Sequence, residues 1–162
     1  MSWILTSLNV NGIRSAARKG FTTWRPKERC DVLAMQELRI QEEQMQAEHK
    51  PPRGWKAVRV QAEKKGYSGV AMLIRKGGIA EGGAVTAGYE CDDEIVQTEG
   101  RLLTLKAPEL PTVIATYVPN SGQKLDRLQY RCETWDRGLA SYVKTLGDTI
   151  VIGDLNCCHL PE

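Results

Sequence analysis

Segments rich in apolar residues alternate along the chain with polar segments that contain Gly, Pro or Asn. A short apolar segment bounded by such turn-forming residues predicts a buried or half-buried β-strand. The pattern predicts strands over residues 3–10, 31–36, 55–60, 70–75, 95–98, 102–106, 113–118 and 149–153. Gly and Pro punctuate the middle strands at intervals that indicate an antiparallel meander.

Helical periodicity is strongest between residues 125 and 146. Apolar residues recur there at steps of three and four and form one stripe: Leu125, Leu128, Cys132, Trp135, Leu139, Val143 and Leu146. Gly147 is typical of a helix C-terminus. A basic helical segment is expected after the Asn11-Gly12 turn, and a polar one over 41–50. Helices interleaved with strands, without repeats or linkers, predict a single α/β or α+β domain over 1–162.

Composition places the chain among globular proteins and excludes several classes. The 162 residues are 41% hydrophobic and 26% charged, unlike a disordered tail, a collagen repeat or a coiled coil. No segment reaches the ~20 apolar residues of a membrane span, and residues 1–6 lack the layout of a signal peptide. We therefore expect a soluble chain with no membrane partner that is not secreted.

Charge and cysteine content add two weaker indications. A net charge of +2 does not by itself indicate nucleic acid, although six basic side chains lie within residues 14–29. The five cysteines are odd in number and show no Cys-x-x-Cys spacing, which favours a reducing compartment. We expect the cytoplasm for a bacterial-type protein and the nucleus for a eukaryotic one.

Polar side chains follow four of the predicted strands at the point where each strand ends. These residues are Asn9 and Asn11, Glu37, Tyr117 and Asn120, and Asp154 and Asn156. Ligands collect at the carboxyl ends of strands in open α/β sheets, and carboxylate and amide oxygens suit Mg²⁺. Taken singly, each residue has a plain structural explanation as a turn or a solvated end. Four strands ending in this way predict a metal-assisted phosphoester site.

Seven blocks of sequence resemble the exonuclease III-type apurinic/apyrimidinic (AP) endonucleases of the endonuclease/exonuclease/phosphatase superfamily. They match in order and cover residues 8–14 (Leu-Asn-Val-Asn-Gly-Ile-Arg), 35–39 (Met-Gln-Glu-Leu-Arg), 64–71 (Lys-Lys-Gly-Tyr-Ser-Gly-Val-Ala), 99–101 (Glu-Gly-Arg), 117–122 (Tyr-Val-Pro-Asn-Ser-Gly), 127–131 (Arg-Leu-Gln-Tyr-Arg) and 153–159 (Gly-Asp-Leu-Asn-Cys-Cys-His). The Tyr-Ser-Gly-Val-Ala and Glu-Gly-Arg blocks favour the DNA-repair branch over the lipid and inositol phosphatases.

The resemblance implies a fold, an activity and a substrate. The fold is the N-terminal part of a four-layer α/β-β/α sandwich. The activity is Mg²⁺-dependent cleavage of the phosphodiester 5′ to an abasic site in base excision repair, with a 3′–5′ exonuclease activity as an addition and Mn²⁺ as an alternative ion. The implied partner is duplex DNA that contains abasic sites.

The resemblance also implies a role for individual residues. The metal residues are Glu37 as principal carboxylate, with Asn9 and Asn11 in or beside the ligand shell. The catalytic residues are Tyr117 and Asn120 at the phosphate, and Asp154 with Asn156 at the attacking water. The residues that contact the DNA backbone are Arg14, Tyr67, Ser68 and Arg101.

The end of the sequence, at Leu160-Pro161-Glu162, leaves alternatives open. Members of the resembled family continue beyond this point, through further strands and a terminal Asp-His pair. We therefore expect an incomplete domain that lacks a C-terminal half or a partner chain and is unstable alone. The alternative functions are an inactive remnant, a half-domain that serves in binding, or the same chemistry on RNA or a phosphoinositide.

Overall fold

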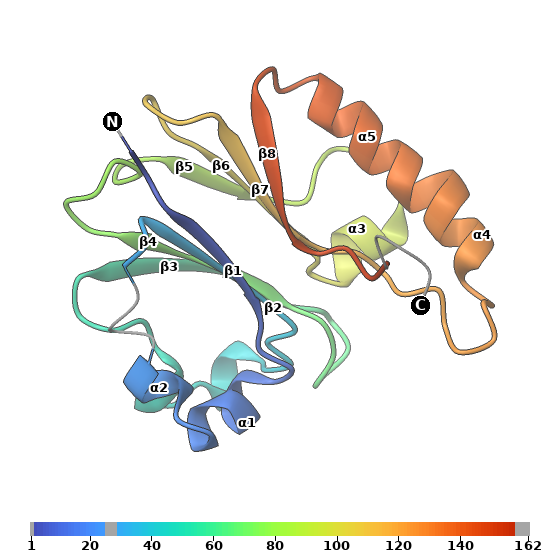
Figure 1. The fold of residues 1–162 in the computed structure, drawn as a ribbon. Coiled ribbons are helices and arrows are strands. Elements are labelled where there is room, and N and C mark those ends of the chain that lie inside the picture. Colours follow the sequence, from blue (N-terminus) through green and yellow to red (C-terminus); the bar gives the residue numbers. More distant parts are fainter. Residues whose placement is uncertain (1, 25–28, 158–162) are drawn as a thin grey trace.

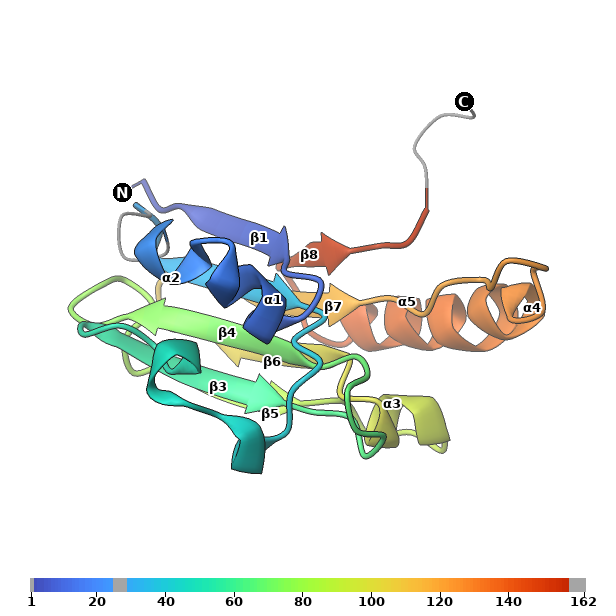
Figure 2. The ribbon, with the colours of Figure 1, turned by 90° about the horizontal axis from the view of Figure 1, so that it is seen from below.

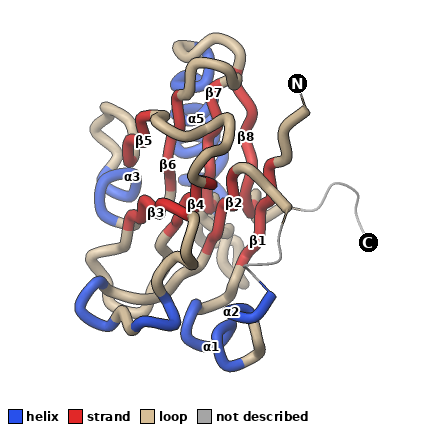
Figure 3. Tube along the Cα trace, turned by 90° about the vertical axis from the view of Figure 1, so that its left-hand side faces the viewer, coloured by secondary structure: helices blue, strands red, loops and turns tan. Residues whose placement is uncertain are grey.

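Two β-sheets packed face to face, with helices outside them, form the molecule (Figure 1). The structure is a computed structural model that describes residues 2–24 and 29–157. The first sheet has the strand order β1-β2-β4-β3 and the second has the order β5-β6-β7-β8. The tube view shows the helices at residues 13–18 and 21–24 below the strands of the first sheet and the helix at residues 136–144 at the height of the second sheet (Figure 3). This arrangement is the predicted α/β sandwich.

Each sheet combines one parallel pair of strands with antiparallel pairs. The strands are β1 (Leu5–Asn9), β2 (Val32–Gln36), β3 (Trp55–Val60), β4 (Val70–Arg75), β5 (Ala84–Ala87), β6 (Leu102–Lys106), β7 (Thr112–Tyr117) and β8 (Thr149–Asp154). The parallel pairs are β1 with β2, where Asn9 pairs with Gln36, and β7 with β8, where Tyr117 pairs with Asp154. Two pairs of strand ends that carry candidate residues are therefore fixed by backbone register.

The central core lies between the sheets, and a second core lies under the outer helices of the first sheet. Val32, Ala34 and Met72 of the first sheet meet Leu103 and Ala115 of the second, and all are fully buried. The opposite face of β2 packs against the helical segments around residues 13–21. Because β2 is buried on both faces, its five residues read as one apolar run rather than an alternating pattern.

The helices differ from the sequence-based expectation in three places. They are α1 (Ile13–Arg18), α2 (Phe21–Trp24), η2 (Glu42–Gln44), η3 (Ala47–His49), α3 (Glu94–Thr98), α4 (Leu128–Tyr130), η4 (Arg131–Trp135) and α5 (Asp136–Lys144). Residues 95–98 were expected to form a strand, but they form a helix because the Asp93 carboxylate accepts a hydrogen bond from the Ile95 N–H at 2.9 Å. Segment 41–50, which was expected to form one polar helix, contains two short 3₁₀ turns. The long helix, which was expected from residue 125, begins at Leu128, because Leu125 has a left-handed φ of 58°.

The last helix contains one wide turn that periodicity did not predict. Residues 131–135 form a π-turn, which brings both Arg131 and Trp135 into the interior. The expected stripe residues Leu128 and Cys132 are exposed instead.

Strand β5 was not predicted because Val85 is its only partly buried residue, so its sequence carries little apolar signal.

Strands β1 and β8, the outer parallel strands of the two sheets, lie side by side (Figures 1 and 2). Neither contains a fully buried residue, although parallel strands are normally covered on both faces. Ile4, Val151 and Leu155 near this side of the molecule are each more than a third exposed.

Within the described residues, no helix is both long and apolar enough to cross a bilayer.

Candidate active site

The carboxyl ends of β1 and β8 are joined by a hydrogen bond between the two sheets. The Asn9 Nδ2 donates to Asp154 Oδ2 at 2.7 Å, across 145 residues of sequence. The other amide atom, Asn9 Oδ1, accepts the Asn11 N–H at 2.9 Å. The sandwich therefore brings the ends of two strands from different sheets to one rim.

A second bridge between the sheets joins Glu37, which follows β2, to Tyr117 at the end of β7. The Tyr117 hydroxyl donates a short hydrogen bond to Glu37 Oε1. The other oxygen, Glu37 Oε2, accepts from Arg39 at 2.7 Å. Glu37 has a φ of 56°, a left-handed conformation rare for a residue with a side chain, and its carbonyl accepts the Gly12 N–H at 2.7 Å. Such backbone conformations concentrate at functional sites.

Tyr117 is a neutral hydroxyl donor over the physiological pH range. Its pKa is raised from 10.0 to about 12, chiefly because the phenol is buried, and also because its hydrogen bond and charge interaction with Glu37 favour the protonated form. The Arg101 guanidinium, 4.7 Å from the ring centroid, opposes this shift. The same hydroxyl also interacts with the side chain of Asn156.

The loop after β8 is held in a fixed shape by its own side chains and by the last helix. Asp154 Oδ1 accepts the Asn156 N–H at 2.9 Å, and Asn156 Nδ2 donates to the Val118 carbonyl at 2.6 Å. Arg131, which is 8% exposed, donates to the carbonyls of Leu155 and Asn156 at 2.7 and 2.6 Å. The loop is therefore anchored to β7 on one side and to the π-turn on the other.

The structure thus gathers most of the candidate metal and catalytic residues at one rim. Those brought together are Asn9, Asn11, Glu37, Tyr117, Asp154 and Asn156. Asn120 is the exception, since it is exposed and its Oδ1 accepts the Gly122 N–H at 3.0 Å within its own loop. It lies three residues after Tyr117, and within the described part of the chain its side chain forms no hydrogen bond with the other six.

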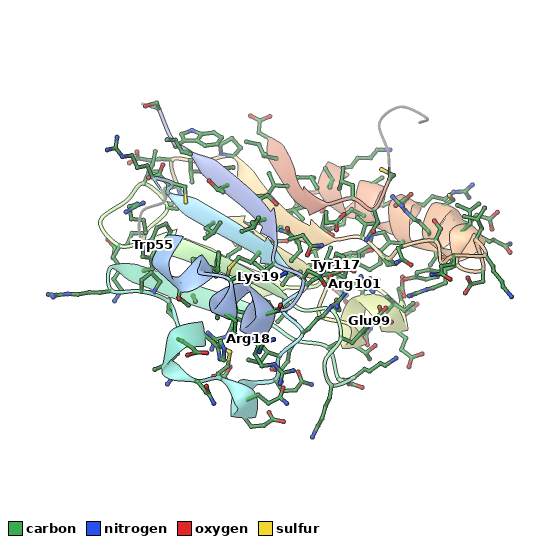
Figure 4. The ribbon with its side chains drawn as sticks, turned by 60° about the horizontal axis from the view of Figure 1, so that its bottom comes forward. Arg18, Lys19, Trp55, Glu99, Arg101 and Tyr117 are labelled. Atoms are coloured by element: carbon green, nitrogen blue, oxygen red, sulfur yellow. The ribbon has the colours of Figure 1, made fainter. Side chains whose placement is uncertain are left out.

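Arg101 and Ser68, which were expected to contact DNA, lie in the interior. Arg101 is 2% exposed, and its guanidinium donates to Glu99 Oε2 at 2.6 Å, to the Tyr117 carbonyl at 3.0 Å and to the Tyr67 hydroxyl at 2.8 Å. Ser68 is 1% exposed. Figure 4 shows Glu99, Arg101 and Tyr117 close together at the end of the sandwich. These positions support the site from beneath and do not offer a surface to a DNA backbone.

The two remaining candidate DNA contacts, Tyr67 and Arg14, are accessible. Tyr67 is partly exposed, and its hydroxyl also accepts from Arg127 at 3.2 Å. Arg14 lines a surface hollow of about 340 Å³ together with Gly12, Ser15, Arg18, Arg39 and Gly66. The roles of Arg39 and Arg131 were missed from the sequence, although both lie inside the quoted blocks 35–39 and 127–131.

The donors at the rim suit a hard cation better than zinc. Glu37 supplies one carboxylate and Asn9 lies on the neighbouring strand, where Asn9 pairs with Gln36. Among residues 2–24 and 29–157, no group of three or more His, Cys, Asp and Glu side chains could hold a metal. Mg²⁺ needs only one or two protein carboxylates, because water and substrate oxygens complete its shell. The residues therefore fit Mg²⁺ in chemistry.

Comparison with known proteins identifies the class to which this site belongs. Residues 6–161 match the model of the endonuclease/exonuclease/phosphatase family, and the chain belongs to that family. It is 34% identical over 159 residues to a DNA-(apurinic or apyrimidinic site) endonuclease of Dictyostelium discoideum, covering 96% of this chain and 42% of that protein. It is also 34% identical over 159 residues to an exodeoxyribonuclease of Bacillus subtilis (strain 168), covering 96% and 59%.

Solved structures agree with the sequence relatives. The AP endonuclease LMAP from Leishmania major superposes with a TM-score of 0.79 at 27% identity, over 94% of this chain and 54% of that one. An AP endonuclease from Archaeoglobus fulgidus gives a TM-score of 0.76 at 27% identity, over 97% and 58%. The predicted family and the predicted sandwich fold are confirmed. The chain spans about half the length of these relatives.

Proposed function

We propose that this chain carries the metal- and phosphate-binding part of a DNA-repair phosphodiesterase that cleaves 5′ to abasic sites. The observation that carries the proposal is the pair of hydrogen bonds between the sheets, Asn9 to Asp154 and Tyr117 to Glu37. They place a carboxylate, a neutral hydroxyl and a second carboxylate at one rim. The names of the sequence relatives supply the substrate class, DNA with apurinic or apyrimidinic sites.

Glu37, with Asn9 and Asn11 beside it, would hold Mg²⁺ or Mn²⁺. The ion, when bound, would offset negative charge on the phosphate as the bond to the leaving 3′ oxygen breaks. Both oxygens of Glu37 accept hydrogen bonds, one from Tyr117 and one from Arg39, and these fix the orientation of the carboxylate. A single carboxylate leaves room in the ion's shell for water and phosphate oxygens.

Tyr117 would act on the phosphate group, and Asp154 would act on the attacking water. The raised pKa keeps the Tyr117 hydroxyl protonated, so it donates a hydrogen bond to a phosphate oxygen on which charge develops. Asp154 would orient or deprotonate the attacking water, with Asn156 holding the loop in place. Asn120, on the exposed loop after β7, would meet the phosphate only once DNA is bound.

Contacts to the DNA backbone would come from Arg14 and Tyr67, with Arg101 and Ser68 as supports beneath them. Arg101 fixes the Tyr67 hydroxyl at 2.8 Å and the Tyr117 carbonyl at 3.0 Å. Contacts to phosphate give affinity without reading sequence, as the repair of a lesion in any context requires. We place this function in the cytoplasm or the nucleus.

A further polypeptide segment would complete the molecule beside β1 and β8. The proposal is supported by the half-exposed parallel strand β8, by exposed Val151 and Leu155, and by relatives about twice as long. A segment that covered these exposed apolar side chains would stabilise the fold by roughly 25 cal/mol for each Å² of apolar surface it buried. Without that segment, the second candidate is a half-domain that binds DNA without cleaving it, supported by the accessible Arg14 in its hollow and by the partly exposed Tyr67.

The test incubates the chain with duplex DNA that holds one abasic site, first with Mg²⁺ and then with EDTA. We expect a nick 5′ to the site with Mg²⁺ and none with EDTA, and none from Glu37→Gln under either condition. Undamaged DNA, RNA and a phosphoinositide serve as comparison substrates. Fluorescence anisotropy measures binding in parallel. Binding without any cleavage at high protein concentration would reject the nuclease in favour of the binding half-domain.

A further inference from the structure

Glu37 and Arg39 project from the same short segment, whose backbone is tightly fixed. Both residues have left-handed φ values, 56° and 50°. Between them, Leu38 is buried, and its backbone N–H donates to the Gly69 carbonyl at 3.1 Å. The backbone N–H of Arg39 donates to the Ser68 carbonyl at 2.9 Å. Any movement of Arg39 must therefore occur in its side chain and not in its backbone.

Arg39 faces two environments of opposite charge. Its guanidinium donates to Glu37 Oε2 at 2.7 Å, and its side chain is 45% exposed, whereas that of Glu37 is 12% exposed. The same side chain lines the hollow of about 340 Å³ that Arg14 and Arg18 also line. Arg14 and Arg18 form no ion pair with an acid among the described residues, so Glu37 is the only carboxylate in contact with this arginine cluster there.

The cluster of Arg14, Arg18 and Arg39 suits a phosphate group. Guanidinium groups bind phosphate through two parallel hydrogen bonds, and three of them around one hollow leave uncompensated positive charge. Gly12 and Gly66 complete the lining without side chains, so a ligand can approach the backbone there. A cation at Glu37 would lie close to the Arg39 guanidinium and be repelled by it.

We propose that Arg39 exchanges between Glu37 and a nucleic-acid phosphate in the arginine hollow, and that this exchange couples binding of the divalent cation to binding of the phosphate. The identity of both ligands rests on the proposed function. Without phosphate, Arg39 competes with the cation for Glu37. With phosphate in the hollow, Arg39 gains another partner and releases the Glu37 oxygen. Coupling between two binding sites is reciprocal, so the cation strengthens phosphate binding by the same factor.

The experiment measures Mn²⁺ affinity by electron paramagnetic resonance of the free ion, with and without an uncleaved, undamaged DNA duplex at constant ionic strength, after subtraction of the Mn²⁺ that the duplex binds without protein. For the natural chain, the duplex tightens Mn²⁺ binding by about fivefold or more, the lower range of typical coupling. Arg39→Met binds Mn²⁺ more tightly than the natural chain without DNA, and the duplex then has no effect. Arg39→Lys retains part of the coupling. Exposed Arg53, replaced by Met, is the matched control and retains all of it.

Two outcomes would overturn the exchange and are separable. Equal Mn²⁺ affinity with and without duplex, in a chain whose Mn²⁺ binding is lost in Glu37→Gln, rejects the coupling and leaves the proposed metal site standing. Unchanged Mn²⁺ binding in Glu37→Gln rejects the metal site itself and the exchange with it. Circular dichroism of each variant verifies that it is folded. Because the Arg39 side chain is half exposed, its replacement leaves the core intact.

Discussion

Replacement of Arg101 by Met tests whether this residue is an interior support or a DNA contact. The guanidinium is 2% exposed and donates three hydrogen bonds, one of them to the Glu99 carboxylate at 2.6 Å. Removing one partner of a buried ion pair costs about 3–5 kcal/mol. Glu99 is 20% exposed and keeps a weaker partner in Arg127 at 3.8 Å, which places the expected cost near the lower value. A loss of ~3 kcal/mol is a large part of the ~5–15 kcal/mol that holds a domain together.

The assay is urea unfolding followed by tryptophan fluorescence, with the midpoint compared at constant slope. For a slope of about 2 kcal/mol per M, a loss of ~3 kcal/mol lowers the midpoint by about 1.5 M. Arg127→Met, at a side chain 28% exposed, is the control and should cost about 1 kcal/mol or less. An Arg101→Met chain as stable as the natural one, but weaker in DNA binding, would refute the interior role and restore the direct contact.

Three further replacements test the site and its support. Tyr117→Phe removes the tyrosine whose pKa is raised to about 12. Because its folded pKa lies above 10.0, the stabilising contribution of Tyr117 is complete below pH 10 and is lost toward pH 12. Urea unfolding of the natural and replaced chains across this pH range measures the contribution. Gly153→Ala should lower the free energy of unfolding by about 3 kcal/mol or more. The φ of Gly153 is 146°, and an added Cβ would lie 1.9 Å from the Thr116 carbonyl oxygen. Thermal melts measure the loss, and an unchanged melt contradicts the close approach. Arg131→Met frees the carbonyls of 155–156. For the cleavage proposed above, we expect a fall in kcat with KM nearly unchanged, and a rise in KM alone argues against a positioning role.

The sequence alone determined the buried strands and the chemistry at their ends. Strands 32–36, 70–75 and 102–106 form where predicted because each is a run of apolar residues that only a covered strand can bury. The polar residues at or just after the ends of β1, β2, β7 and β8 were recognisable because apolar packing does not explain them. Short-range signals that compete with hydrophobicity were harder to interpret, as the Asp93 cap at 95–98 and the π-turn at 131–135 show.

Only the tertiary structure decided which of those residues meet and which charges are buried. Asn9 and Asp154 are 145 residues apart, so no local pattern reports that their strands end at the same rim. Arg101 resembles a surface cation in sequence, yet it is buried because Glu99 and two tyrosines from other segments satisfy its guanidinium. Local sequence sets which backbone conformations and burials are favourable, whereas contacts between distant segments depend on how the two sheets pack, and that packing is a property of the whole chain.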